Sequence, residues 1–163
     1  MRACVSKPLD EVRAMIAAGA DVNKHDEDGF GPLMCASVEG RADVIELLLQ
    51  HGAHVDAVDE DGRSPLSWVV TKGDFERAAQ SLISAGADIN RADAGGFTPL
   101  MRAALLDNVR CFELLVRNGA DTRVVHPDWR KTALEIAIER GSEALKAIAE
   151  KLRTQQPGSN NPG

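Results

Sequence analysis

The 163-residue sequence is poor in aromatic residues and contains no tyrosine. Phe and Trp make up 4% of the chain, although the hydrophobic fraction as a whole is 44%. This composition indicates one domain of helices that pack closely through Ala and Leu. No apolar run approaches the roughly 20 residues of a membrane span. The N-terminus also lacks the uninterrupted apolar segment of a signal peptide, so we expect a cytoplasmic protein.

Motifs of catalysis and metal binding are also missing. The sequence contains no Gly-x-x-x-x-Gly-Lys, His-Glu-x-x-His or Gly-x-Ser-x-Gly, so we expect neither an enzyme nor a cofactor. Its three cysteines are Cys4, Cys35 and Cys111; they form no Cys-x-x-Cys pair and are expected to be reduced, buried thiols. Its four histidines lack metal-ligand spacing and are expected to be solvated loop residues: His25, His51, His54 and His126.

What the sequence does contain is a repeat. The glycine of a Gly-Ala pair recurs at Gly19, Gly52, Gly86 and Gly119, at intervals of 33, 34 and 33 residues. The leucine of a second motif recurs in step with it, at Leu33, Leu66, Leu100 and Leu134. A fixed internal period of this length indicates a stacked array, in which each unit buries its apolar face against its neighbours.

The units resemble ankyrin repeats, whose first helix opens with Thr-Pro-Leu-His. The matching segments are Gly31-Pro32-Leu33-Met34, Ser64-Pro65-Leu66-Ser67, Thr98-Pro99-Leu100-Met101 and Thr132-Ala133-Leu134-Glu135. The resemblance covers residues 4 to about 152 and implies an all-α repeat solenoid. In this fold, antiparallel helix pairs stack and are joined by β-hairpin-like loops. No unit carries the histidine of the motif, which costs each repeat a local hydrogen bond.

We expect five units, at about 1–25, 26–58, 59–92, 93–125 and 126–153. The first is truncated, with residues 2–7 in place of a first helix, and the last is a C-terminal cap whose second helix spans residues 143–152. Extra residues fall in the helix–helix turn at 74–77 and in the hairpin at 124–131. The Pro/Gly-rich residues 154–163 should form a disordered tail.

Acidic residues recur within the hairpins. Asp26, Asp59 and Asp93 stand at one place per unit, which favours capping of the hairpin backbone over calcium binding. The net charge is −8 over residues 1–62 (13 acidic, 5 basic) and +2 over residues 63–163 (12 acidic, 14 basic). Nucleic acid is therefore an unsuitable ligand. A protein partner with some basic surface is favoured, and a merely solvated acidic face is the alternative.

The resemblance implies a non-catalytic protein–protein interaction module, a monomer that binds one protein on its concave face. The hairpin-tip residues carried over from the family are Glu27, Asp28, Phe30, Glu60, Asp61, Arg63, Ala94, Phe97, Trp129, Arg130 and Lys131. The first-helix residues are Val38, Glu39, Thr71, Lys72, Leu105, Leu106, Glu139 and Arg140. A dedicated inhibitor, such as an immunity-type protein that neutralises a toxin or enzyme, is the alternative function.

Some of these side chains leave two interpretations open. Leu105 and Leu106 form an exposed apolar cluster that indicates a binding site, or they pack into the neighbouring unit because Asp107 replaces the helix-breaking glycine. Phe30 and Phe97 either face a partner or pack within the stack of hairpins.

Overall fold

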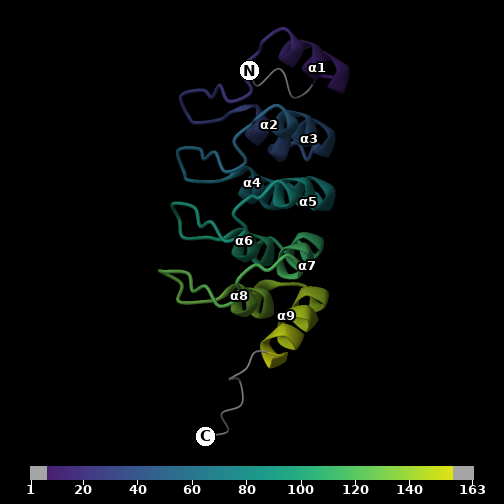
Figure 1. Cartoon of the computed structure of the whole chain (residues 1–163). Helices are drawn as coiled ribbons and strands as arrows, with labels where there is room; N and C mark the ends of the chain where they lie inside the picture. Colours follow the sequence, from purple (N-terminus) through teal and green to yellow (C-terminus); the bar gives the residue numbers. More distant parts are fainter. Residues whose placement is uncertain (1–6, 156–163) are drawn as a thin grey trace, which may run out of the picture.

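Residues 7–155 form a row of helix pairs in the computed structural model, which describes these residues and not residues 1–6 or 156–163 (Figure 1). The helices are α1 (Leu9–Ala17), α2 (Pro32–Val38), α3 (Ala42–Gln50), α4 (Pro65–Lys72), α5 (Glu76–Ser84), α6 (Pro99–Leu105), α7 (Val109–Arg117), α8 (Ala133–Arg140) and α9 (Glu143–Gln155). No strand forms in this part of the chain; Val125 and Thr132 make an isolated antiparallel bridge.

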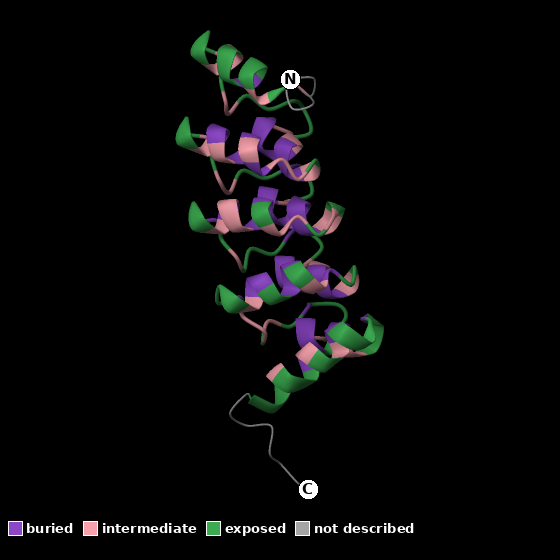
Figure 2. Cartoon of the chain, turned by 90° about the vertical axis from the view of Figure 1, so that its right-hand side faces the viewer, coloured by how far each residue is buried: buried purple, intermediate pink, exposed green. Residues whose placement is uncertain are grey.

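The helices are arranged in two layers. The first helices α2, α4, α6 and α8 contact one another in order, while α1, α3, α5 and α7 stack beside them. Figure 1 shows the hairpin loops projecting from the first-helix side, away from the second helices. Every helix contributes buried residues to the core (purple in Figure 2), among them Ile45, Leu66, Leu82, Leu100 and Leu115. The predicted all-α repeat solenoid is confirmed.

The repeated motifs mark where the helices begin and end. Proline occupies the first turn of α2, α4 and α6, where its missing N–H costs no hydrogen bond. Ser64, Thr98 and Thr132 cap their helices through the side-chain oxygen, whereas Gly31 has none to offer. The Gly-Ala glycines follow the ends of the second helices with φ between +83° and +88°, a region open to glycine.

Two boundaries differ from those expected. The extra residue of the third unit was expected in the turn at 74–77, but that turn, Gly73 to Phe75, is as long as those of the second and fourth units. The extra residue instead lengthens α4 to 8 residues, against 7 in α2 and in α6. Asn108 holds this turn by donating to the carbonyl oxygens of Val70 and Gly73, at 3.2 and 2.6 Å. The final helix continues to Gln155, so residues 154 and 155 of the expected tail are helical. Residues 156–163, and all but the last of residues 2–7, lie outside the described part of the chain.

Candidate functional site

Each hairpin is held by the side chain of its first residue. Asp59 is 6% exposed, and its Oδ1 accepts hydrogen bonds from the backbone N–H groups of Asp61 and Arg63, at 3.0 and 2.8 Å. The corresponding bonds join Asp26 to the N–H groups of Asp28 and Phe30, and Asp93 to those of Gly95 and Phe97. The predicted capping role of the three aspartates is confirmed.

The second carboxylate oxygen of the two buried aspartates ties the hairpin to the first helix. Asp59 Oδ2 accepts from Trp68 Nε1 at 2.8 Å, and Asp93 Oδ2 accepts from Arg102 Nε at 2.6 Å and from its Nη2. Such charge-assisted bonds are stronger than neutral ones. They fix the orientation of the hairpin and of the Trp68 and Arg102 side chains together.

The fifth unit has His126 in place of the aspartate. Its Nδ1 accepts from the backbone N–H groups of Asp128 and Trp129, both at 3.2 Å, so it performs the same capping role with a different side chain. His126 is 1% exposed, so the expectation that it is solvated is wrong. The other three histidines are exposed, as expected: His25, His51 and His54.

Neighbouring hairpin tips are joined backbone to backbone. The N–H of Ala94 donates to the carbonyl of Asp61 at 2.8 Å, and the N–H of Glu60 donates to the carbonyl of Asp28 at 3.1 Å. Pro127 stands at the equivalent place in the fifth hairpin and has no N–H to donate. The second, third and fourth hairpins therefore form one hydrogen-bonded ladder, which the fifth cannot join in this way.

A first aromatic cluster lies where the second and third units meet. The rings of Phe30 and Trp68 contact edge to face at 5.3 Å between centroids. The Arg63 guanidinium and the Lys72 ammonium lie over the Trp68 ring at 5.0 and 5.2 Å. A groove of about 320 Å³ opens here, and its walls are Phe30, Cys35, Val38, Glu39, Trp68 and Lys72.

A second aromatic cluster joins the fourth and fifth hairpins. Phe97 and Trp129 are almost perpendicular, with ring centroids 5.1 Å apart. Arg102 lies over Phe97 at 5.1 Å and Arg140 lies over Trp129 at 5.2 Å. Trp129 is 37% exposed, so part of its side chain is accessible to a partner.

The sequence matches the family model described as ankyrin repeats in three copies, over residues 1–93 and 75–161. The chain belongs to the ankyrin repeat family. It is 27% identical over 142 residues to YahD of Escherichia coli (strain K12), named as an ankyrin repeat protein, covering 84% of this chain and 70% of that one. It is 40% identical over 55 residues to an ankyrin repeat protein of Acanthamoeba polyphaga mimivirus, covering 34% of this chain and 5% of that one. Ankyrin repeats generally mediate protein–protein interaction, and the family is typically non-catalytic.

The ankyrin hairpins and first helices together form the inner face, which we define as residues 26–31, 59–63, 93–97 and 126–131 with the solvent-facing sides of α2, α4, α6 and α8. None of the predicted partner-binding residues is buried. The exposed ones are Glu27, Asp28, Glu39, Glu60, Asp61, Lys72, Leu106, Trp129, Arg130, Glu139 and Arg140. The half-buried ones are Phe30, Val38, Arg63, Thr71, Phe97, Leu105 and Lys131.

The two leucines of the expected apolar cluster have different environments. Leu105 is half-buried and packs against the core, whereas Leu106 is 49% exposed at the end of α6. Leu106 lines a groove with Thr71 and Lys72, between the ends of successive first helices. Asp107, which replaces the helix-breaking glycine, follows the end of α6 with φ +56°. Its carboxylate accepts a hydrogen bond from the backbone N–H of Ser142 at 2.8 Å.

Sequence reasoning did not assign Trp68 and Arg102 to the inner face. Trp68 is 9% exposed, yet it forms a wall of the groove and is a partner of Phe30. Arg102 occupies the same repeat position, 34 residues later. This shared repeat position could have identified both residues from the sequence, because it places a side-chain donor beside the hairpin aspartate in both units.

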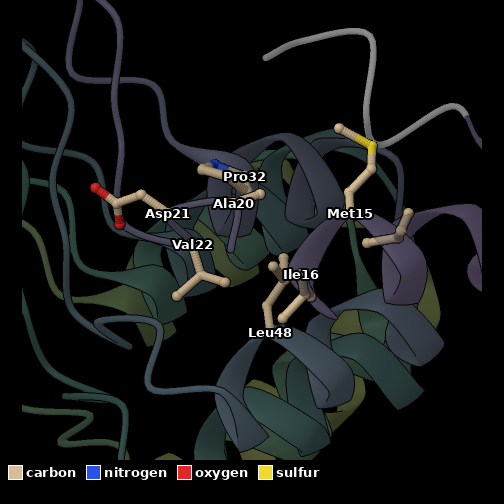
Figure 3. Close-up of a pocket in the computed structure, with 8 residues that line it drawn as sticks. Met15, Ile16, Ala20, Asp21, Val22, Pro32 and Leu48 are labelled. Atoms are coloured by element: carbon tan, nitrogen blue, oxygen red, sulfur yellow. The ribbon is translucent and has the colours of Figure 1, made fainter. Parts of the chain in front are cut away.

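Two further openings lie away from the hairpins. A groove of about 410 Å³ between α7 and α9 is lined by Glu113, Val116, Arg117, Ile148, Lys151, Leu152 and Gln155. A gap of about 20 Å³ beneath α1 is lined mainly by apolar residues, with Ile16, Val22 and Leu48 converging on it (Figure 3). This holds about one water, and an apolar lining keeps such a gap dry. Among residues 7–155, no group of three His, Cys, Asp or Glu side chains is placed to bind a metal ion. No described helix has the length and apolar character needed to cross a membrane.

The two described cysteines, Cys35 and Cys111, are thiols that form no disulfide. Cys111 is buried, and desolvation followed by the nearby charge of Asp74 raises the pKa of its thiol to about 12. Cys35 is only half-buried, because it faces the groove beside Trp68. The prediction of buried thiols therefore holds for Cys111 and is wrong for Cys35, and Cys4 lies outside the described residues.

Proposed function

We propose that this protein binds a protein partner on its inner face and catalyses no reaction. The observation that supports the proposal is the pair of aromatic clusters on that face, Phe30–Trp68 and Phe97–Trp129, each flanked by basic side chains. Aromatic and arginine side chains supply most of the energy at protein interfaces. The first cluster also lines the groove of about 320 Å³.

The clusters are fixed before a partner arrives. Trp68 is held by the Asp59 carboxylate, and Arg102 by the Asp93 carboxylate. Immobilising a flexible side chain on binding costs about 0.5–1.5 kcal/mol. Because these side chains are already ordered in the free protein, much of that cost is avoided.

The charge of the hairpin tips supports a partner with a basic segment. Glu27, Asp28 and Glu60 are exposed at neighbouring tips, and the Glu60–Asp28 backbone bond keeps two of these residues side by side. Such a field acts mainly on the rate of association, and salt screens it within about 10 Å at 0.1 M. We therefore propose that association slows as salt rises. We also propose a cytoplasmic monomer, which accords with the reduced state of Cys35 and Cys111.

Affinity capture from the source cell, followed by mass spectrometry, would identify a partner, and dissociation constants with the purified partner would then test the surface. We expect Trp129→Ala to weaken binding about thirtyfold or more, the loss of a hot-spot side chain worth about 2 kcal/mol. Arg77→Ala is the matched control, because Arg77 is exposed on α5 in the outer layer. Circular dichroism would verify that both variants are folded.

Equal affinities of the wild type and the Trp129→Ala variant, or a larger loss in the Arg77→Ala variant, would overturn the assignment of the inner face. If the partner is an enzyme or toxin whose activity disappears on binding, the protein is a dedicated inhibitor. If its activity persists, the protein is a scaffold or adaptor.

A further inference from the structure

The fifth hairpin, residues 126–131, is anchored by a histidine, His126. In the three preceding hairpins the anchor is an aspartate. Histidine is the side chain whose ordinary titration changes its charge between about pH 5 and 8. The exchange of aspartate for His126 therefore gives one hairpin a different response to acid from the others.

The bonds of His126 require the neutral ring. Both partners of Nδ1, the backbone nitrogens of Asp128 and Trp129, are donors, so Nδ1 must be the unprotonated acceptor and the proton must reside on Nε2. Nε2 is buried and has no hydrogen-bond partner. A proton added to Nδ1 would face two N–H groups, and the charge would lie in a ring that is 1% exposed.

The surroundings of the ring do not compensate such a charge. The ring packs against Phe97 at 4.1 Å and Trp129 at 5.3 Å, and Nε2 lies 3.6 Å from the place of a Cβ on Gly96. The charged residues of its own hairpin are Asp128, Arg130 and Lys131. Those of the preceding hairpin and of α6 are Asp93 and Arg102, and those of α8 are Glu135, Glu139 and Arg140. These are four acidic and four basic groups. Asp93 is already bonded to Arg102, and Glu139 to Lys131.

We propose that His126 is a pH-sensitive latch for the fifth hairpin. The backbone of His126 closes the base of the hairpin by donating to the carbonyl of Lys131 and accepting from the N–H of Arg130, at 2.9 and 3.0 Å. The neutral ring holds the tip by accepting the two further backbone bonds, and protonation releases the tip. Since the closed hairpin excludes the proton and the open hairpin accepts it, the closed form is fully stable above the titration range of an exposed imidazole. That stability is lost as the pH falls through this range.

The hairpin is suited to separate opening. Pro127 removes the backbone bond that joins the other tips, so packing on Gly96 and Phe97 is what holds this tip to its neighbour. Opening would move Trp129 away from Phe97 and Arg140. If the inner face binds a partner as proposed, acid would therefore remove the C-terminal part of that binding surface.

Amide NMR of the full chain between about pH 7.5 and pH 5 tests the latch without any partner. We expect the amide resonances of Asp128 and Trp129 to shift together and their hydrogen-exchange protection to fall. The fall should approach tenfold per pH unit, since the open state binds one proton more than the closed state. The amides of Gly95 and Phe97, which are bonded to Asp93, are internal controls and should keep their protection.

Two variants assign the transition to a residue. His126→Asp restores the anchor of the other hairpins and should abolish the transition, whereas His51→Gln removes an exposed histidine and should leave it unchanged. Constant protection of the Asp128 and Trp129 amides in the wild type would overturn the proposal by itself, even if His126→Asp did not fold. Persistence of the transition in His126→Asp would overturn it as well. Because no partner takes part, failure of the proposed binding function would leave these results untouched.

Discussion

Asp59→Asn should destabilise the protein by reversing the polarity of one buried contact. The substitution keeps the shape of the side chain, and the remaining oxygen can still accept from the N–H groups of Asp61 and Arg63. However, the amide NH₂ group then replaces Oδ2, which accepts the Trp68 Nε1–H at 2.8 Å. In the variant the Asn NH₂ group and the Trp68 Nε1–H, both donors, would face each other, whereas in the wild type the Trp68 Nε1–H donates to an ionised carboxylate oxygen.

The magnitude follows from the burial of both partners, 6% exposed for Asp59 and 9% for Trp68. A hydrogen bond to a charged group contributes about 1.5–3 kcal/mol, and a buried donor left without an acceptor costs about 1–3 kcal/mol. Because these contributions overlap, we expect a loss of about 3 kcal/mol in the free energy of unfolding. Urea denaturation followed by circular dichroism would measure it.

A double-mutant cycle isolates the contact. Trp68→Phe removes the indole N–H and should itself destabilise the protein, because Asp59 Oδ2 loses its donor. In that background Asp59→Asn should cost about 1 kcal/mol or less, giving a coupling energy of about 2 kcal/mol. Asp26→Asn is the matched control at an exposed anchor, where a loss of about 1 kcal/mol or less is expected. A cost of Asp59→Asn that is the same with Trp or Phe at position 68 would refute this explanation of how the hairpin is fixed.

Two further predictions concern packing and reactivity. Gly40→Ala should destabilise the protein by about 1–3 kcal/mol more than Gly52→Ala. Both glycines have a positive φ, so the backbone cost is shared, but a Cβ on Gly40 would lie 2.4 Å from the Phe75 ring, whereas a Cβ on Gly52 would face open space. Equal losses on urea denaturation would show that Phe75 moves aside freely. Alkylation at about pH 8, followed by mass spectrometry of the peptides, should modify Cys35 and spare Cys111. At this pH a thiol whose pKa is about 12 has about a thousandfold less thiolate than a thiol with the ordinary pKa of 9.0. Equal alkylation rates of Cys35 and Cys111 would contradict this prediction.

The fold could be predicted because each unit repeats signals that act locally. Proline and a capping hydroxyl start the first helix, and glycine ends the second, as at Ser64 and Gly52. Four copies in the same order leave few alternatives to a stack. The exception is the extra residue of the third unit, which lengthens α4 to 8 residues instead of lengthening the turn that follows it. Residue spacing alone fixes the total from one motif to the next, and it does not show whether the helix or the turn takes up the extra residue.

The details of the inner face were harder to predict, because they depend on which way side chains point. The sequence places Leu105 and Leu106 side by side, but α6 ends between them, so Leu105 packs inward and Leu106 faces solvent. Likewise, Trp68 could have been an ordinary core residue. In the structure its indole N–H is bonded to Asp59, and its ring contacts Phe30 and forms a wall of the groove.

The linear architecture determines how far a change at one hairpin can spread. In a repeat array each unit contacts only its neighbours, and its stability is the sum of local contributions. Release of the fifth hairpin would remove the support that Trp129 gives to Phe97. The Phe30–Trp68 cluster is fixed separately through Asp59 and would remain in place. Acid would therefore divide the inner face into a retained N-terminal part and a released C-terminal part. A partner that needs only the acidic tips would stay bound, whereas one anchored on Trp129 would dissociate, so the latch would change the choice of partner and would not simply switch binding off.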